Sequence, residues 1–141
     1  NSILALREAL DAGCEEALLL DNEGYVAEGS GENVFLVRDG TIYTPELTSC
    51  LEGITRDSIF RIAADLGYQI RERRITRDEV YVADEAFFTG TAAEVVPICE
   101  LDGRAIGPGS RGPLTEQLQS IYFDTVRGRE SQYGAWLTPV S

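Results

Sequence analysis

The sequence predicts an α+β fold, built on a mainly antiparallel sheet or pseudo-barrel with flanking helices. Short apolar runs of strand length outnumber the helical patterns, and most follow one another through turn residues such as Asp39-Gly40. The helical patterns are few and do not alternate regularly with strands, as they would in a doubly wound parallel sheet. A chain of 141 residues without repeats or linkers fits a single domain.

The first half of the chain is expected to begin with a helix over 2–12, because apolar residues recur there at helical spacing until Gly13. Two pairs of strands are expected next, at 16–21 with 25–27 and at 33–38 with 41–43. A second helix is expected over 55–66 and ends at Gly67. Its expected apolar side consists of Ile54, Ile59, Ile62, Ala63 and Leu66.

In the second half, residues 68–75 alternate in polarity and are expected to form a half-exposed strand. Thr76 and Glu79 make a capping-box pattern that starts a short helix. Further strands are expected at 85–89 and 94–101, with a turn at Asp102-Gly103. Pro113 marks the start of the last helix, and Trp136 is expected to anchor the tail.

The composition excludes several classes of partner. The net charge of −12 argues against nucleic acid and anionic membranes, since both need a basic surface. No apolar run approaches the roughly 18 residues that span a bilayer, and the start lacks the features of a signal peptide. The cysteines are widely spaced without a CxxC pair, as is typical of reduced cytosolic thiols. We therefore expect a cytoplasmic protein with no metal site and no nucleic-acid or membrane partner.

Three residue types are absent from the sequence: histidine, lysine and methionine, since all 12 cations are arginine. Without histidine the usual acid-base residue near neutral pH is missing. Without lysine, nothing in this chain can form a Schiff base with a carbonyl compound. The beginning at Asn1-Ser2 indicates an internal segment of a longer product, although processing would give the same start.

The segment from Glu28 to Asn33, Glu-Gly-Ser-Gly-Glu-Asn, is the first of three glycine-bracketed segments. It lacks the third glycine of a dinucleotide fingerprint, and its glycine spacing does not match a nucleophile elbow. What remains is the carboxylate of Glu28 at a strand end, beside glycines that let a ligand approach the backbone. The alternative is a glycine bulge with solvated acids.

The other two segments suggest anion sites. Gly53, Ile54 and Thr55 stand at a helix start, where free amides and the helix dipole favour an anion such as phosphate; the alternative is a plain N-cap threonine. The small residues of Gly90-Thr91-Ala92 can expose consecutive N–H groups as an anion-binding nest, or simply make a tight turn. Together the three segments suit a phosphate-bearing cofactor with a basic ring nitrogen.

In their order and spacing these segments resemble the fold-type IV pyridoxal-phosphate enzymes, specifically the branched-chain amino acid aminotransferases. The resemblance covers essentially the whole chain. It is carried by Gly24-Tyr-Val-Ala-Glu-Gly-Ser-Gly-Glu-Asn-Val-Phe35, Gly53-Ile-Thr-Arg-Asp57, Tyr81-Val-Ala-Asp-Glu85, Thr89-Gly-Thr-Ala-Ala-Glu94, Gly112-Pro-Leu-Thr115 and Trp136-Leu137.

The resemblance implies pyridoxal 5'-phosphate as cofactor and a role for each residue. Glu28 matches the glutamate that pairs with the pyridine nitrogen. Ile54 and Thr55 match the positions that hold the phosphate, and Leu51 matches the apolar residue packed against the ring. Thr91 matches a further phosphate contact, and the amides of Thr91 and Ala92 match those that face the substrate carboxylate.

The same resemblance implies a Schiff-base lysine a few residues before Asn1 and a small N-terminal domain, neither of which is in this sequence. Residues 1–141 then correspond to the C-terminal large domain, and we expect this chain alone to be inactive. The complete enzyme would exchange amino groups between leucine, isoleucine or valine and 2-oxoglutarate, as a dimer or hexamer. The alternatives are a D-amino acid aminotransferase or aminodeoxychorismate lyase of the same fold, or a non-catalytic ligand-binding or assembly module.

Overall fold

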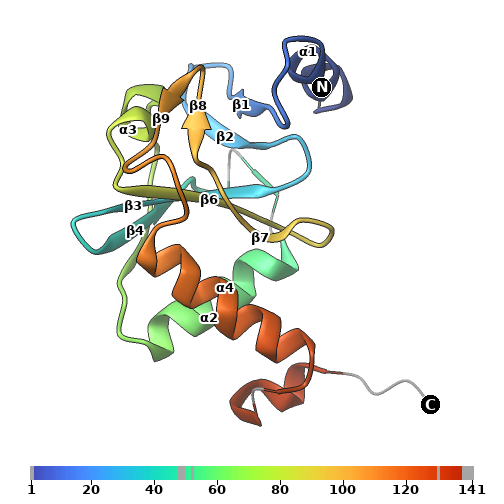
Figure 1. The fold of residues 1–141 in the computed structure, drawn as a ribbon, viewed down its shortest axis with the longest axis vertical. Helices are drawn as coiled ribbons and strands as arrows, with labels where there is room; N and C mark the ends of the chain where they lie inside the picture. Colours follow the sequence, from blue (N-terminus) through green and yellow to red (C-terminus); the bar gives the residue numbers. More distant parts are fainter. Residues whose placement is uncertain (1, 48–49, 52, 130, 138–141) are drawn as a thin grey trace.

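The fold in the computed structural model is α+β, as predicted, and the model describes residues 2–47, 50–51, 53–129 and 131–137 (Figure 1). Its elements in chain order are α1 (Ser2–Asp11), β1 (Leu18–Leu20), β2 (Val26–Gly29), β3 (Asn33–Arg38), β4 (Thr41–Thr44), α2 (Ile54–Asp65), β5 (Ile70–Glu72), α3 (Arg77–Tyr81), β6 (Glu85–Gly90), β7 (Glu94–Pro97), β8 (Glu100–Leu101), β9 (Arg104–Ala105), α4 (Pro113–Val126) and the 3-10 helix η1 (Ser131–Trp136). None of these helices is long and apolar enough to cross a membrane.

The central sheet has five strands in the order β5-β4-β3-β6-β7. All neighbours are antiparallel except β4 and β5, which run parallel. The prediction of a mainly antiparallel sheet is therefore confirmed. The parallel pair arises because α2 connects β4 to β5, and a helical crossover returns the chain in the same direction. β5 is also shorter than the strand predicted over 68–75.

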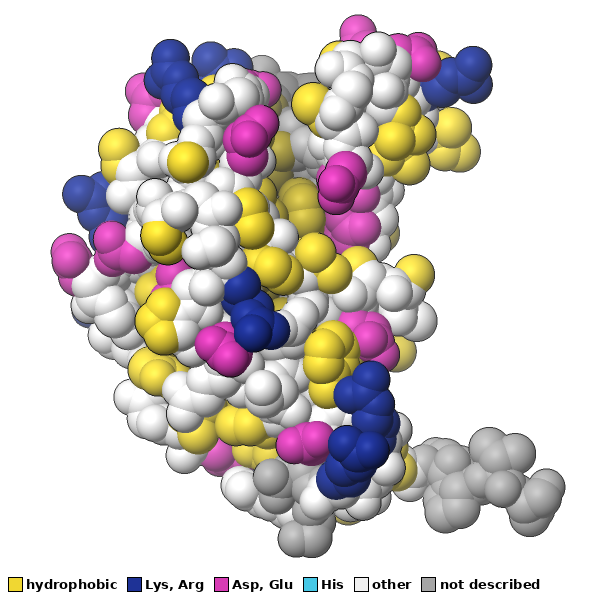
Figure 2. Space-filling model, in the orientation of Figure 1, with side chains coloured by type: hydrophobic (Ala, Val, Ile, Leu, Met, Phe, Trp, Pro, Cys, Tyr) yellow, Lys and Arg dark blue, Asp and Glu magenta, His cyan; other side chains and the backbone are white. Residues whose placement is uncertain are grey.

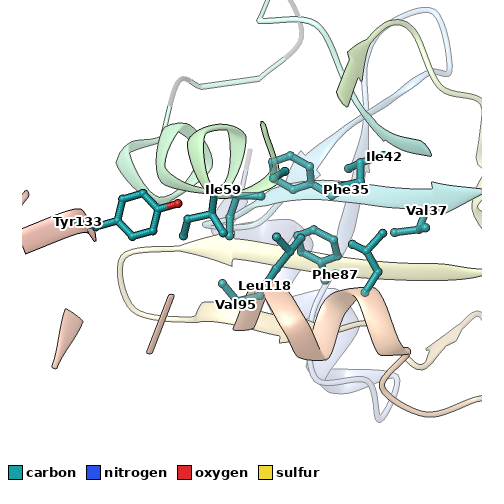
Figure 3. Close-up of a cluster of buried hydrophobic side chains, with 11 residues drawn as sticks. Phe35, Val37, Ile42, Ile59, Phe87, Val95, Leu118 and Tyr133 are labelled. Atoms are coloured by element: carbon teal, nitrogen blue, oxygen red, sulfur yellow. The ribbon is translucent and has the colours of Figure 1, made fainter. Parts of the chain in front are cut away.

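One face of the sheet packs against α2 and α4 and forms the larger core (Figures 1 and 3). Phe35 on β3 lies opposite Phe87 on β6, and their rings stack with centroids 5.0 Å apart. Ile59 of α2 and Leu118 of α4 point at this pair and are fully buried. Burying each such side chain contributes about 1.5–3 kcal/mol, so the two helices are held to the sheet mainly by apolar packing.

The other face of the sheet carries a second cluster of buried residues: Val26, Val34, Leu36, Ile75, Val80, Ala83, Ala86, Phe88 and Ile106. β2 and α3 contribute to it directly, and Val26 donates its N–H to the carbonyl of Ile75 at 2.8 Å. The predicted capping box is present, with Thr76 and Glu79 each bonding the other's backbone N–H. This reciprocal cap explains how a five-residue helix is stable here.

Three details differ from the sequence prediction. The strand expected over 94–101 is divided into β7 and β8, and β7 ends at Pro97, which has no N–H to continue the ladder. Ile54 is 81% exposed, because it lies about 140° around the helix from Ile59. Leu66, also predicted to be inside, is the C-cap of α2 and is exposed.

The tail is anchored by Tyr133 and not by Trp136 as predicted. Trp136 is 41% exposed, whereas Tyr133 is 5% exposed and belongs to the core that α2 and α4 cover. The hydroxyl of Tyr133 also donates to Asp65 Oδ2 at 2.7 Å, which joins η1 to the end of α2.

Candidate functional site

The segments that carry the predicted site residues reach one side of the sheet, the right side of Figure 1. The turn after β2, the start of α2 and the turn between β6 and β7 all reach this side, and Figure 2 shows the surface hollowed there below α1. Strand pairing explains the convergence, since Asn33 at the start of β3 lies opposite Thr89 near the end of β6.

Glu28 and Leu51 are brought together by a hydrogen bond. Glu28 stands on β2 opposite Leu19, and its Oε2 accepts the backbone N–H of Leu51 at 3.2 Å. The side chain of Leu51 is 76% exposed although it is apolar. A carboxylate and an exposed apolar side chain therefore share one side of the molecule.

Asn33, which has no role predicted from the sequence motifs, contacts the same segment. It is 6% exposed, and its Nδ2 donates to the carbonyl of Leu51 at 2.7 Å. A Cβ added to Gly53 would lie only 2.4 Å from Asn33 Oδ1, so the backbone at Gly53 rests directly on this amide. A signal for Asn33 is present in the sequence, because this polar residue begins β3 directly before four apolar residues, which are buried.

The start of α2 has free backbone amides. Its N-cap is Gly53, in an extended conformation, and no side-chain cap is formed. The helix ladder begins with the N–H of Asp57 donating to the carbonyl of Gly53 at 3.1 Å, so the amides of Ile54 and Thr55 precede it. The reading of Thr55 as a plain N-cap is therefore wrong. Its buried hydroxyl lies 3.4 Å from that of Tyr122 on α4, a contact that was not predicted.

Thr91 and Ala92 are exposed in the turn between β6 and β7. This turn packs against the turn after β2, because a Cβ added to Gly90 would be 3.1 Å from the carbonyl oxygen of Gly31. Glycine is required here by close approach, not by dihedral angle. The contact brings the third predicted segment beside the first.

A pair of carboxyls, Glu16 and Glu32, lies next to these two turns. Glu16 Oε1 accepts hydrogen bonds from the amide and hydroxyl of Ser30 and, at 2.7 Å, from the amide of Ala17. Burial opposes ionisation of Glu16, but these bonds and one from Glu32 outweigh it and lower its pKa. Burial, together with the bond to Glu16 and its charge, raises the pKa of Glu32 from 4.5 to about 7.

Four of the predicted residues, Leu51, Ile54, Thr91 and Ala92, are exposed, whereas Thr55 is buried. A cavity of about 280 Å³ lies elsewhere, between the β3–β4 hairpin and α3, and includes Arg38, Tyr43 and Arg73. Its Arg73 is already paired with Glu79 at 2.8 Å. A smaller hollow of about 160 Å³ adjoins the β6–β7 turn and is lined by Glu15, Glu16, Glu32, Phe88, Ala93 and Val96. We place the candidate site where the turns converge, because the Glu28 carboxylate, the free amides at the start of α2 and the exposed β6–β7 turn all lie on that side.

Comparison with known proteins identifies the family of the chain. The family model for amino-transferase class IV matches residues 1–101. The chain belongs to the class IV aminotransferases. Among curated members, it is 63% identical to the branched-chain-amino-acid aminotransferase of Pseudomonas aeruginosa and 52% identical to the probable one of Aquifex aeolicus. Each alignment covers 99% of this chain and 46% of the relative.

Solved class IV aminotransferases have the same fold. The branched-chain aminotransferase of Thermoproteus uzoniensis with norvaline superposes with a TM-score of 0.95 at 52% identity, over 99% of this chain and 46% of that one. A second branched-chain amino acid aminotransferase, complexed with N-(5'-phosphopyridoxyl)-L-glutamate, superposes with a TM-score of 0.97 at 58% identity, over 99% of this chain and 48% of that one. That second enzyme has also been solved with pyridoxamine 5'-phosphate. The chain therefore spans about half the length of the relatives that it matches.

Proposed function

We propose that this chain is the cofactor-binding large domain of a branched-chain amino acid aminotransferase. The complete enzyme would transfer amino groups between leucine, isoleucine or valine and 2-oxoglutarate. One observation carries the proposal: the structure gathers a carboxylate, an uncapped helix start and an exposed turn of small residues on one side of the sheet. The printed names of the relatives support this reading over a D-amino acid aminotransferase or a lyase.

The residues present fit pyridoxal 5'-phosphate. No described side chain caps α2, so the amides of Ile54 and Thr55 are available to a phosphate at the positive end of the helix dipole. The hydroxyls of Thr55 and Thr91 add donors to the same group. Glu28, held by the amide of Leu51, presents a carboxylate to a basic ring nitrogen. The exposed Leu51 side chain is suited to cover an aromatic ring.

The bound cofactor would supply the electron-withdrawing ring that makes a proton on the substrate α-carbon acidic. Glu28 would keep the ring nitrogen protonated, which sustains that withdrawal. The amides of Thr91 and Ala92 would orient the substrate through its carboxylate. The catalytic proton carrier is not among these residues, since the chain has neither lysine nor histidine.

We therefore propose that the lysine belongs to an N-terminal half of the same cytoplasmic enzyme, which acts as a homo-oligomer. Asn1, before which the lysine is expected, lies outside the described residues. We expect the purified 141-residue chain to give no aminotransferase turnover with added pyridoxal phosphate. We expect the full-length protein to convert leucine and 2-oxoglutarate to 4-methyl-2-oxopentanoate and glutamate. Turnover by the chain alone above the free-cofactor rate would overturn the proposal that the catalytic lysine belongs to the N-terminal half.

Two further outcomes would separate the alternatives. A full-length protein that prefers D-alanine to L-leucine would indicate a D-amino acid aminotransferase. A full-length protein that binds pyridoxal phosphate but transfers no amino group would indicate a binding module. Glu28→Gln in the full-length protein is the matched variant, because it keeps the size of the side chain and removes its charge. It should lower kcat by roughly 10-fold or more while leaving the phosphate contacts intact.

A further inference from the structure

Glu32 occupies the space between two turns of the candidate site. A Cβ added to Gly29 would be 2.7 Å from Glu32 Oε2, and one added to Gly90 would be 3.1 Å from Glu32 Cγ. The side chain therefore touches both the turn that follows Glu28 and the turn that leads to Thr91. Neither glycine can carry a larger side chain without displacing Glu32.

The contact with Glu16 requires a proton. Glu32 Oε2 is shielded from solvent and has no hydrogen-bond partner among the described residues, and the Glu32 and Glu16 side chains line the same hollow, where their carboxyls interact. Two carboxylates cannot bond each other unless one carries a proton. Glu16 accepts two hydrogen bonds from Ser30 and one from Ala17, so it is better suited to the negative charge. The proton therefore belongs on Glu32.

The surroundings strengthen this assignment, because the hollow that Glu32 lines contains no cation among its described lining residues, which are Glu15, Glu16, Phe88, Ala93 and Val96. The other charged residues of this hollow, Glu15 and Glu16, are both acidic. Ionised Glu32 would add a further negative charge to this group without compensation. Burial, followed by the interaction with Glu16 and its charge, raises the pKa of Glu32.

We propose that Glu32 is a positioning residue that, by donating a hydrogen bond to Glu16, holds the turn after Glu28 and the Gly90–Ala92 turn at their working separation. The role rests on the proposed function, since it acts through Glu28, which would face the cofactor, and through Thr91 and Ala92, which would face the substrate carboxylate. When Glu32 loses its proton, the negative charges of Glu16 and Glu32 repel each other, and this repulsion moves the two turns apart. Substrate binding then weakens above about pH 7.

The test uses the full-length protein with Glu32→Gln, Glu32→Ala and the control Glu15→Gln. Glutamine donates a hydrogen bond to Glu16 at every pH, whereas alanine donates none. In the unaltered protein and in Glu15→Gln, we expect KM for L-leucine to rise several-fold between about pH 6.5 and about pH 8.5. In Glu32→Gln the KM for L-leucine should stay at its pH 6.5 value over the whole pH range. In Glu32→Ala the KM should be about 10-fold higher at every pH, with a smaller change in kcat. A merely structural role for Glu32 would give no difference in pH profile between Glu32→Gln and the unaltered protein.

A second readout does not depend on activity. In protein labelled with ¹³C at the glutamate side-chain carboxyl, one resonance should titrate near pH 7 and disappear in Glu32→Gln. If no glutamate titrates near this pH, or if Glu32→Gln keeps the pH profile of the unaltered protein, the inference is overturned. If no variant transfers amino groups, the proposed function fails, while the NMR titration still decides whether Glu32 holds the proton. Glu32→Gln carries the test even if Glu32→Ala does not fold.

Discussion

Asn33 and Gly53 are expected to be energetically coupled, and the coupling can be calculated from their contact. Asn33→Ala removes the 2.7 Å bond from Nδ2 to the carbonyl of Leu51. Because Leu51 is exposed, its carbonyl can regain water, and the loss should be about 1 kcal/mol. The segment before α2 would then be held less firmly, and the affinity for pyridoxal phosphate should fall roughly 5-fold.

Gly53→Ala acts on the same contact from the other side. The new Cβ would be 2.4 Å from Asn33 Oδ1, about 1 Å inside a normal contact, which should cost about 1–3 kcal/mol. In the Asn33→Ala background that oxygen is gone. The cost of Gly53→Ala should then fall by at least about 1 kcal/mol, so the double variant is more stable than the two single effects predict.

The assay is urea unfolding of the full-length protein, with pyridoxal phosphate binding followed by absorbance. Asn22→Ala and Gly134→Ala are matched controls, since Asn22 is an exposed turn residue and a Cβ at Gly134 meets nothing within 4 Å. Each control should change stability by less than about 0.5 kcal/mol. If the effects of Asn33→Ala and Gly53→Ala simply add, Asn33 does not support the α2 start as described.

Three other perturbations test separate parts of the structure. Glu85→Ala should destabilise the protein by about 2–3 kcal/mol in urea unfolding, because the buried Glu85 carboxylate accepts hydrogen bonds from the amides of Leu114 and Thr115 at 3.2 and 2.8 Å. The control Glu100→Ala, at an exposed position, should have almost no effect. An equal loss of stability in both variants would refute the capping role of Glu85. Arg56→Met should cost about 1.5–3 kcal/mol through loss of the 2.6 Å charged hydrogen bond to Glu72, since the Arg56 side chain is buried. An unchanged urea midpoint would refute this role. The pKa of Glu32 is raised from 4.5 to about 7, so protonated Glu32 stabilises the folded state fully below pH 4.5, and this contribution is lost as the pH rises to about 7. The pKa shift corresponds to at most about 3 kcal/mol in the free energy of unfolding, which solvent screening reduces to about 1–2 kcal/mol. The free energy of unfolding of the unaltered protein, relative to Glu32→Gln, should therefore decline over this range, and a constant difference would contradict the shared proton.

The sequence predicted the elements whose signals are local. The β3–β4 hairpin, the capping box at Thr76 and the bounds of α2 to within one residue follow from turn chemistry and periodicity. The parallel placement of β5 did not follow, because strand direction depends on the crossover through α2 and not on the strand's own residues. Trp136 was wrongly predicted as the anchor because size suggests burial, whereas Tyr133 also has Asp65 as a hydrogen-bond partner.

In the candidate site, too, residues with local sequence signals could be predicted, whereas those that depend on tertiary contacts could not. Glu28, Thr55 and Thr91 could be selected because glycines and a helix start flag them in the sequence. The Glu16–Glu32 pair could not, because its importance comes from a contact between segments that are distant in the chain. Asn33 is marked only by its polar side chain at the start of β3, and its role likewise depends on a distant contact, with Leu51. Such contacts leave no periodic signal, and the geometry that creates them exists only in the folded protein.

The cap of α4 has a consequence for how the chain folds. Gly112 begins the helix without a side-chain cap of its own, and the carboxylate that replaces it belongs to Glu85 on β6, 30 residues before Thr115. A peptide of residues 111–128 should therefore be only weakly helical, since its first-turn amides have no local acceptor. The last helix gains its cap only after β6 is in place. The sheet and α4 should consequently be lost in one cooperative transition, with hydrogen exchange from the two occurring together.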